Sequence, residues 1–229
     1  MHKTVFGEMM KKNETSVIVN GRKFEIKKKP CYELIKRAFD IMVSLLCLIL
    51  FFWIFILIAV AIRMDDGGPA FYVSKRVGKY GKEFSFYKFR SMKTDADETF
   101  EQIKHRNEIK GDLFKIKNDP RITRIGKILR RTSLDEFPQI INILKGDMSF
   151  VGPRPPLPRE VANYSDEAFR RLSIIGGLTC YWQIRGRSEI DFEGMLKLDC
   201  QYIEDRSIWT DLKILALTIP AVFRGNGAY

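Results

Sequence analysis

The main hydrophobic feature of the chain is an uninterrupted apolar run from Ile41 to Ile62. Ser44 is the only polar side chain among these 22 residues. At about 1.5 Å of rise per residue, a helix of this length covers the roughly 30 Å hydrocarbon core of a bilayer. A buried helix of a soluble protein rarely stays apolar on every side for so long. The pattern therefore predicts a membrane-inserted helix, which we assign to residues 31–64.

The charges that flank this run are compatible with two membrane topologies. Basic residues both precede and follow the run, whereas positive charge usually stays on the cytoplasmic side of a membrane. A re-entrant helix, which enters and leaves on the cytoplasmic face, would relieve this conflict and is the arrangement we expect. No Pro or Gly within residues 41–62 would bend such a helix, so a simple span stays open as the alternative.

The remaining patterns predict a mixed fold of helices and strands. Residues 1–30 form a basic extension in which Asn20-Gly21 predicts a hairpin turn, with a flexible tail as the alternative. In residues 65–229, expected to form a small globular domain, strands are predicted near 70–73 and 84–90 around a turn at 78–81. An amphipathic segment at 209–224 predicts an interfacial helix, with a core helix as the alternative. We therefore expect an α/β fold of the helix-rich α+β type with interfacial amphipathic helices.

Composition narrows the possible chemistry. The formal net charge of +11 suits an anionic partner, but Lys and Arg are spread along the whole chain, so no nucleic-acid binding is expected. Four cysteines without C-x-x-C spacing predict neither a zinc site nor a disulfide framework. The only histidines, His2 and His105, do not suggest a Ser-His-Asp triad. Catalysis would depend on carboxylates, Lys and Arg, with a hard, oxygen-bound metal as a possible addition.

An adjacent pair of acids, Asp135 and Glu136, stands where we expect a helix to begin. Pro138 is tolerated only in a first helical turn, so the helix is predicted to start near Asp135 and to stop at Gly146. Unpaired backbone N–H groups and the helix dipole would keep Asp135 ionised there, as a nucleophile at phosphorus requires. The alternative is that Ser133 and Glu136 only form a capping box.

A pair of basic residues lies on the second predicted strand. Alternation along residues 84–90 places Lys88 and Arg90 on the same face. Together they could bind a phosphate. The alternative is an ordinary solvated strand end.

Several motifs in a fixed order resemble one known family. They are Lys36-Arg37-Ala38-Phe39-Asp40, Phe89-Arg90-Ser91-Met92, Ser133-Leu134-Asp135-Glu136-Phe137-Pro138-Gln139, Gly146-Asp147-Met148-Ser149-Phe150-Val151-Gly152-Pro153-Arg154-Pro155, Gly177-Leu178-Thr179 and Asp211-Leu212-Lys213-Ile214-Leu215. Over about residues 34–223 the chain resembles the bacterial sugar transferases, which are monotopic polyprenol-phosphate phosphoglycosyl transferases, in their compact catalytic-core form. It departs from the family where Phe51-Phe52-Trp53-Ile54 replaces a helix-bending Ser-Pro pair, and where Cys180 replaces a Gly.

The resemblance implies a ping-pong reaction at the cytoplasmic face of a bacterial inner membrane. In the family, an Asp attacks a nucleotide-diphosphate sugar, usually a UDP-sugar, and releases a nucleoside monophosphate. The resulting sugar-phosphate-aspartyl enzyme then passes the sugar phosphate to polyprenyl (undecaprenyl) phosphate, in the first membrane step of exopolysaccharide synthesis. By position, Asp135 would be the nucleophile, and Glu136 would handle protons or hold Mg²⁺ together with Asp135. Residues 65–229 would then be the cytoplasmic catalytic domain.

The resemblance also implies which cations meet the substrates. Arg154 ranks first for the diphosphate, because the flanking Pro153 and Pro155 hold it on a stiff extended backbone. The further candidates are Arg130, Arg187, Lys88 and Arg90 for the donor, and Lys36 and Arg37 for the polyprenyl-phosphate headgroup. The rival reading is a non-catalytic basic membrane anchor or scaffold that binds acidic lipid and protein partners. The sequence indicates neither the sugar nor the oligomeric state.

Overall fold

The computed structural model describes residues 14–96, 98–99, 116, 119–186 and 190–223. The strands are β1 (Glu14–Val19), β2 (Arg22–Lys27), β3 (Phe71–Val77), β4 (Glu83–Phe89), β5 (Met148–Val151) and β6 (Gly176–Thr179). The helices are α2 (Pro30–Asp66), α4 (Arg124–Thr132), α5 (Gln139–Lys145), α6 (Pro158–Ala162), α7 (Tyr181–Arg185), α8 (Phe192–Asp205) and α9 (Ile208–Phe223), with 3-10 turns η1 (Lys79–Gly81), η3 (Leu134–Glu136) and η4 (Ala168–Ser173). The predicted mixture of helix and strand, with helix in excess, is confirmed.

Helix α2 contains the predicted membrane run and extends slightly beyond residues 31–64. Pro30 fits its first turn, where no backbone N–H is needed, and Gly67 ends it with a left-handed φ of 74°. Its side chains are largely uncovered, with Ile49 70% exposed. Within the described residues it is the one helix long and apolar enough to cross a membrane. Such an exposed apolar surface indicates that the chain associates with a membrane.

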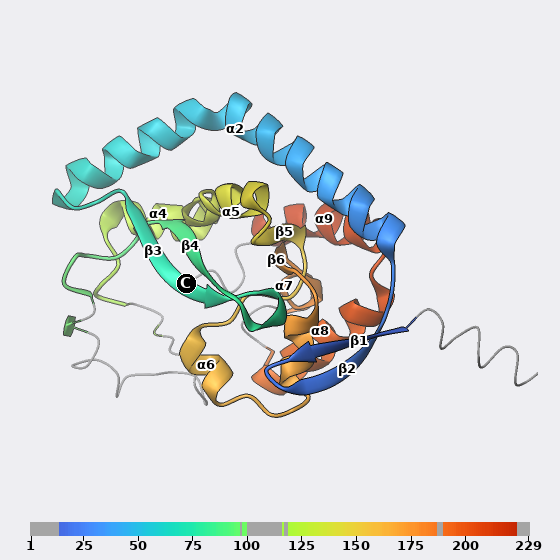
Figure 1. Ribbon diagram of the computed structural model, residues 1–229. Helices are drawn as coiled ribbons and strands as arrows, with labels where there is room; N and C mark the ends of the chain where they lie inside the picture. Colours follow the sequence, from blue (N-terminus) through green and yellow to red (C-terminus); the bar gives the residue numbers. More distant parts are fainter. Residues whose placement is uncertain (1–13, 97, 100–115, 117–118, 187–189, 224–229) are drawn as a thin grey trace, which may run out of the picture.

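Helix α2 arches over the globular part of the chain, which contacts both of its ends (Figure 1). Near its start, Arg37 donates hydrogen bonds of 2.6 and 2.7 Å to the carbonyls of Ile143 and Leu144, at the end of α5. At its other end, Asp66 forms a bidentate ion pair with Arg90, with one contact of 2.5 Å. The helix continues through residues 51–54, where the resemblance would place a Ser-Pro bend.

The N-terminal hairpin is confirmed for residues 14–27, and residues 1–13 lie outside the described part of the chain. Strands β1 and β2 pair antiparallel around Asn20 and Gly21, whose φ values of 48° and 79° are the left-handed angles of a tight hairpin turn. Val19 and Ile26 are buried, so the hairpin packs into the core rather than forming a flexible tail.

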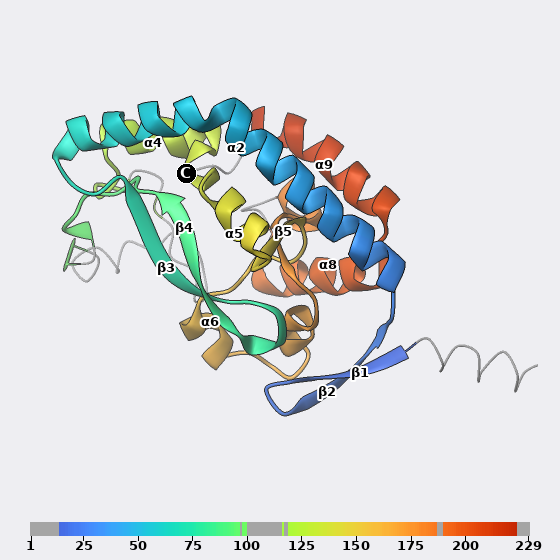
Figure 2. The ribbon, with the colours of Figure 1, turned by 45° about the horizontal axis from the view of Figure 1, so that its top comes forward.

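Two further strand pairs position the loops that follow. Strands β3 and β4 form the second predicted hairpin, with Tyr72 opposite Lys88. Strands β5 and β6 are parallel and buried, and their core neighbours include Ile143, Tyr202 and Ile214 from three different helices. This core joins α5, α8 and α9 into the body over which α2 arches (Figures 1 and 2).

Helix α9 combines features of both predicted alternatives. Ile214 is completely buried, as in a core helix, while Leu217 and Ile219 are 43% and 61% exposed. Trp209, in its first turn, is 82% exposed. The helix runs beside the first half of α2 (Figure 2), so its uncovered apolar side chains lie near the predicted membrane helix.

Candidate active site

The acid pair lies in a 3-10 turn rather than at the start of an α-helix. Helix α4 ends where Ser133 adopts a left-handed φ of 57°, and the Ser133 side chain makes no capping hydrogen bond. The predicted helix start near Asp135 was wrong, because Pro138 has no N–H to donate to the carbonyl of Leu134. Instead, the N–H of Phe137 donates a 3.1 Å hydrogen bond to the carbonyl of Leu134, and α5 begins only after the proline. The predicted stop is confirmed by the φ of 89° at Gly146.

Lys88 of β4 lies between the two carboxylates. Its Nζ is 2.7 Å from Glu136 Oε1 and 3.6 Å from Asp135 Oδ2. Arg154 Nη1 lies 3.7 Å from the same Glu136 oxygen. The structure thus brings together four residues that the sequence predicted, from three separate segments of the chain.

The two acids have opposite electrostatic environments. Burial raises the pKa of Asp135, and the neighbouring Glu136 adds to this effect while Lys88 opposes it. Burial also opposes ionisation of Glu136, but Lys88 and Arg154 outweigh it and lower the pKa of Glu136 to about 2. The expected stabilisation of ionised Asp135 by a helix N-terminus is missing because no α-helix starts there.

The segment carrying Arg154 is held by close backbone packing. The N–H of Gly177 donates to the carbonyl of Pro153, and the N–H of Gly152 to that of Thr179, both at 2.9 Å. A Cβ on Gly177 would lie only 2.1 Å from the backbone nitrogen of Gly152. The glycines of these two motifs therefore let β6 fix the segment from which Arg154 extends.

Two more arginines lie near the acid pair. Arg130 of α4 donates to Ser91 Oγ at 2.9 Å and lies close enough to favour the ionised form of Asp135. Arg76 of β3, which sequence reasoning missed, likewise favours ionised Glu136 and donates to the carbonyl of Pro155 at 3.1 Å. Burial, with Arg154 nearby, lowers the pKa of Arg76 to about 10. Only the β3–β4 register indicates that Arg76 belongs near the acid pair, because it places Arg76 on the same sheet face as Lys88.

Aromatic contacts connect the acid pair to the membrane helix. The ring of Phe137, the residue after Glu136, stacks on Phe55 of α2 at 5.5 Å between centroids and 8° between planes. Phe51, one turn earlier in α2, lies 6.0 Å away. The site is therefore fixed next to the middle of the long apolar helix.

Other predicted site residues make contacts elsewhere. Arg90 is 6% exposed and binds Asp66 and the carbonyl of Pro69, so the described contacts do not bring it to the acid pair. Arg187 lies outside the described residues.

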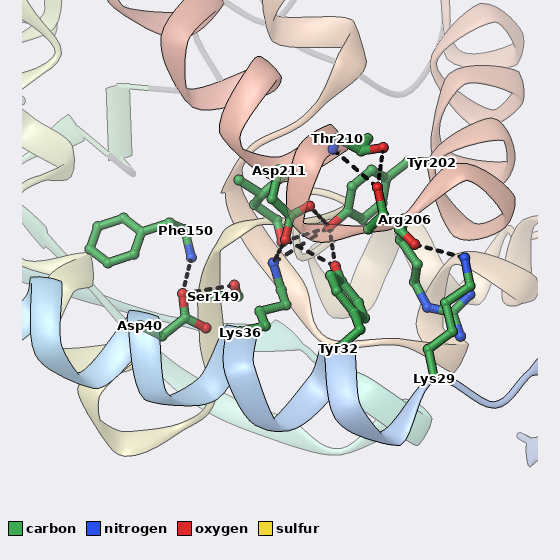
Figure 3. A network of polar contacts seen from close by, with 12 residues as sticks. Lys29, Tyr32, Lys36, Asp40, Ser149, Phe150, Tyr202, Arg206, Thr210 and Asp211 are labelled. Atoms are coloured by element: carbon green, nitrogen blue, oxygen red, sulfur yellow. Dashed lines mark hydrogen bonds and ion pairs between the residues drawn. The ribbon is translucent and has the colours of Figure 1, made fainter.

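The motif that begins with Lys36 attaches α2 to the globular body (Figure 3). Lys36 is 8% exposed and forms a 2.6 Å ion pair with Asp211, whose other oxygen accepts a hydrogen bond from Tyr202. Asp40 accepts hydrogen bonds from Ser149 Oγ and the backbone N–H of Phe150. Lys36 and Arg37 thus have structural partners, and their role at a polyprenyl-phosphate headgroup stays a prediction.

The carboxylates at the site fit one kind of metal binding. Within the described residues, no cluster of three or more His, Cys, Asp or Glu side chains could hold a metal ion. Mg²⁺, however, is commonly bound through one or two carboxylates together with substrate phosphates. Asp135 and Glu136 could supply those carboxylates, with the remaining ligands coming from substrate and water.

Comparison with known proteins identifies the family. The family model for bacterial sugar transferases matches residues 31–225. The chain belongs to the bacterial sugar transferase family. The resemblance inferred from the motifs is therefore confirmed, and Asp135, Glu136, Lys88 and Arg154 all lie within the matched region.

Several relatives of this family member are informative about its extent. It is 46% identical over 214 residues to galactosyl transferase CpsE of Streptococcus agalactiae, covering 93% of this chain and 47% of CpsE. It is 42% identical over 200 residues to an undecaprenyl-phosphate galactose phosphotransferase of Salmonella typhimurium, covering 85% of this chain and 42% of that protein. Exopolysaccharide production protein ExoY of Rhizobium meliloti is 38% identical over 205 residues, with 88% of this chain and 91% of ExoY covered. The chain thus spans less than half of the first two relatives and nearly all of ExoY.

Proposed function

We propose that this chain is a phosphoglycosyl transferase that moves a sugar phosphate from a UDP-sugar to polyprenyl phosphate, at the first membrane step of exopolysaccharide synthesis. The observation that carries the proposal is the acid pair of Asp135 and Glu136, surrounded by cations and fixed against an apolar helix, in a bacterial sugar transferase. Relatives named as undecaprenyl-phosphate galactose and glucose phosphotransferases support this substrate class.

The proposed reaction has two displacements at phosphorus. An Asp135 carboxylate oxygen attacks the sugar-bearing phosphorus, the bond to the bridging oxygen breaks, and UMP leaves with that oxygen. A phosphate oxygen of polyprenyl phosphate then attacks the same phosphorus, and the Asp135 carboxylate is released unchanged. The product is a polyprenyl-diphosphate sugar.

The cations at the site match the charge problem of this reaction. An anionic nucleophile must approach an anionic diphosphate, so catalysis needs positive charge fixed beside the reacting groups. Lys88 and Arg154 already neutralise Glu136, while Arg76 adds positive charge near Glu136 and Arg130 adds it near Asp135. A bound Mg²⁺ held by Asp135 or Glu136 would neutralise phosphoryl oxygens further.

We also propose that α2 is re-entrant, with the catalytic domain on the cytoplasmic face. One globular body contacts α2 near its start, through Lys36 and Arg37, and at its end, through Asp65 and Asp66. A simple span would separate these contacts by the thickness of the bilayer. The basic flanks on both sides of the apolar run favour the same topology.

The first prediction is that Asp135→Asn abolishes transfer. Membranes containing the full chain should release UMP from a panel of UDP-sugars, and mass spectrometry after incubation with donor alone should find sugar phosphate on the Asp135 peptide. The variant should lose both signals, by about 10⁴-fold or more for turnover, as expected when a covalent nucleophile is removed.

The matched control is Asp166→Asn, since the Asp166 side chain is 85% exposed and pairs with Arg22 away from the site. It should keep normal UMP release. Turnover that persists in Asp135→Asn would refute the assigned nucleophile.

A further inference from the structure

An open groove lies at the start of α2, where it meets the start of α9. Its volume is about 540 Å³, and apolar surface dominates its lining. The lining residues that matter here are Lys29, Tyr32, Ile35, Arg206, Ile208 and Trp209. None of them belongs to the acid pair or to the cations around it.

Two cations line this groove without an acidic partner. Lys29 donates to the carbonyls of Glu204 and Arg206, at 3.0 and 2.7 Å, and Arg206 donates to the carbonyls of Ile203 and Lys27. Neither cation forms an ion pair within the described residues. Arg206 is 3% exposed, and its Nε has no hydrogen-bond partner.

Lys29 immediately precedes α2, Arg206 lies between α8 and α9, and the two cations lie close together (Figure 3). Burial and the adjacent Arg206 lower the pKa of Lys29, although Glu204 and Asp205 act in the opposite direction. The carboxylate of Glu204 is itself paired with Arg170. A buried or half-buried pair of like charges is costly, so an anion bound between them would relieve an unfavourable interaction.

The apolar part of the groove is exposed on the surface. Ile35 and Trp209 are 53% and 82% exposed. Ile35 precedes the apolar run of α2 by six positions, and Trp209 lies in the first turn of α9. Exposed Trp side chains are enriched where headgroups meet hydrocarbon. A ligand that fits therefore has an anionic head and a hydrocarbon tail.

The groove is far from the acid pair. Tyr32 precedes Phe55, the stacking partner of Phe137, by 23 positions in the same helix. At about 1.5 Å of rise per residue this is roughly 35 Å along the helix axis. A phosphate held by Lys29 and Arg206 could not reach Asp135, so the occupant is not an acceptor in transfer.

We propose that this groove is a binding site for the phosphate headgroup and first acyl segment of an anionic bilayer phospholipid, held by Lys29 and Arg206. The inference depends on membrane association of α2 and not on the proposed transfer reaction. Lipid binding can therefore fail while transfer persists, and the reverse also holds.

Native mass spectrometry of the full chain in mild detergent would test the site. Purified protein is mixed with dioleoyl phosphatidylglycerol or with dioleoyl phosphatidylcholine at equal molar ratio, and retained lipid is counted. We expect preferential retention of phosphatidylglycerol. Lys29→Gln should reduce it about fivefold, which corresponds to the roughly 1 kcal/mol contributed by one Lys at an anionic lipid surface. Lys29→Arg should retain it.

The matched control is Lys28→Gln, which removes the same charge from the exposed neighbouring residue outside the groove. It should bind phosphatidylglycerol like the wild type. Equal losses in Lys28→Gln and Lys29→Gln, or equal retention of the two lipids by the wild type, would overturn the proposal. Displacement of phosphatidylglycerol by equimolar undecaprenyl phosphate would overturn the assigned occupant. Melting temperatures measured without lipid would show whether Lys29→Gln remains folded.

Discussion

At the scale of single residues, the surroundings of Asp135 oppose the ionisation that its proposed role requires. The proposed nucleophile has to be ionised, yet burial and the adjacent Glu136 raise its pKa. The cations beside the pair interact most strongly with Glu136, and they hold that acid ionised. Glu136 thus keeps Lys88 and Arg154 in position while Asp135 stays only partly compensated. A partly compensated carboxylate is easier to esterify than one held by a close ion pair.

The unfavourable ionisation of Asp135 predicts that Asp135→Asn stabilises the fold while it abolishes activity. Because the pKa of Asp135 is raised on folding, ionisation of this side chain costs stability once the pH exceeds its folded pKa. At neutral pH the variant should melt above the wild type, by about 2–4 °C if the cost is near 1 kcal/mol. The gain should shrink as the pH falls through the pKa of Asp135.

Glu136→Gln should destabilise the fold at neutral pH. The pKa of Glu136 is lowered to about 2, so its ionised form stabilises the fold above its ordinary pKa and loses that effect only as the pH falls towards 2. Thermal melts of both variants from about pH 2 to about pH 8 would compare them directly, because the loss for Glu136 occurs at the acidic end of that range. A lower melting temperature for Asp135→Asn at neutral pH would contradict this account.

Local sequence pattern and family resemblance together predicted most of the acidic and basic residues that meet in the structure, but not the contacts that each of them makes. Asp135, Glu136, Lys88 and Arg154 come together as predicted. Arg76 was missed because a lone Arg on a strand carries no signal until the register with β4 is known. Arg90 and Lys36, predicted as phosphate ligands, form ion pairs with acids distant in sequence, Asp66 and Asp211, and their phosphate role stays a prediction. Such long-range pairing cannot be read from spacing.

At the scale of elements, α4 is positioned by a contact that only glycine permits. A Cβ on Gly126 would lie 2.0 Å from the carbonyl oxygen of Ser91. The same segment receives hydrogen bonds from Thr123 and Arg130. Helix α4 therefore lies directly on the chain that follows β4, and this places Arg130 beside the acid pair.

Gly126→Ala is accordingly expected to destabilise the protein. Ala is favoured over Gly inside a helix by about 1 kcal/mol, but steric overlap with a backbone carbonyl should cost about 1–3 kcal/mol more than that gain. Urea unfolding should show the loss. Gly194→Ala in α8 is the control, since only the side chains of Ile190 and Asp191 would have to move. Equal stability of Gly126→Ala and wild type would show that α4 can shift freely.

The helix boundaries illustrate the limit of pattern reasoning at this scale. The stop at Gly146 was predictable because a left-handed glycine ends a helix locally. The start was misplaced because Pro138 has no N–H to donate, so α5 begins only at Gln139. Asp135 therefore lies in the preceding 3-10 turn, away from the N-terminus of α5.

At the scale of the whole molecule, the topology of α2 has a direct test. Cys31 is exposed at its start, and Met64, near its end, is 82% exposed. Two chains would each carry one cysteine, at position 31 or as Met64→Cys, with the other native cysteines replaced by Ala. A membrane-impermeant maleimide should label both chains in inside-out vesicles and neither in right-side-out vesicles. Labelling from opposite faces would establish a simple span instead.

The double attachment of α2 also limits how the enzyme can move. A domain attached to a membrane helix at one point can change its distance from the bilayer, whereas a body attached at both ends of the helix keeps a constant distance from it. Asp135 is further tied to that distance by the stack of Phe137 on Phe55. In the proposed reaction, the water-soluble sugar nucleotide would therefore approach the membrane to a fixed depth, and the lipid-borne phosphate would reach the same depth by lateral diffusion alone.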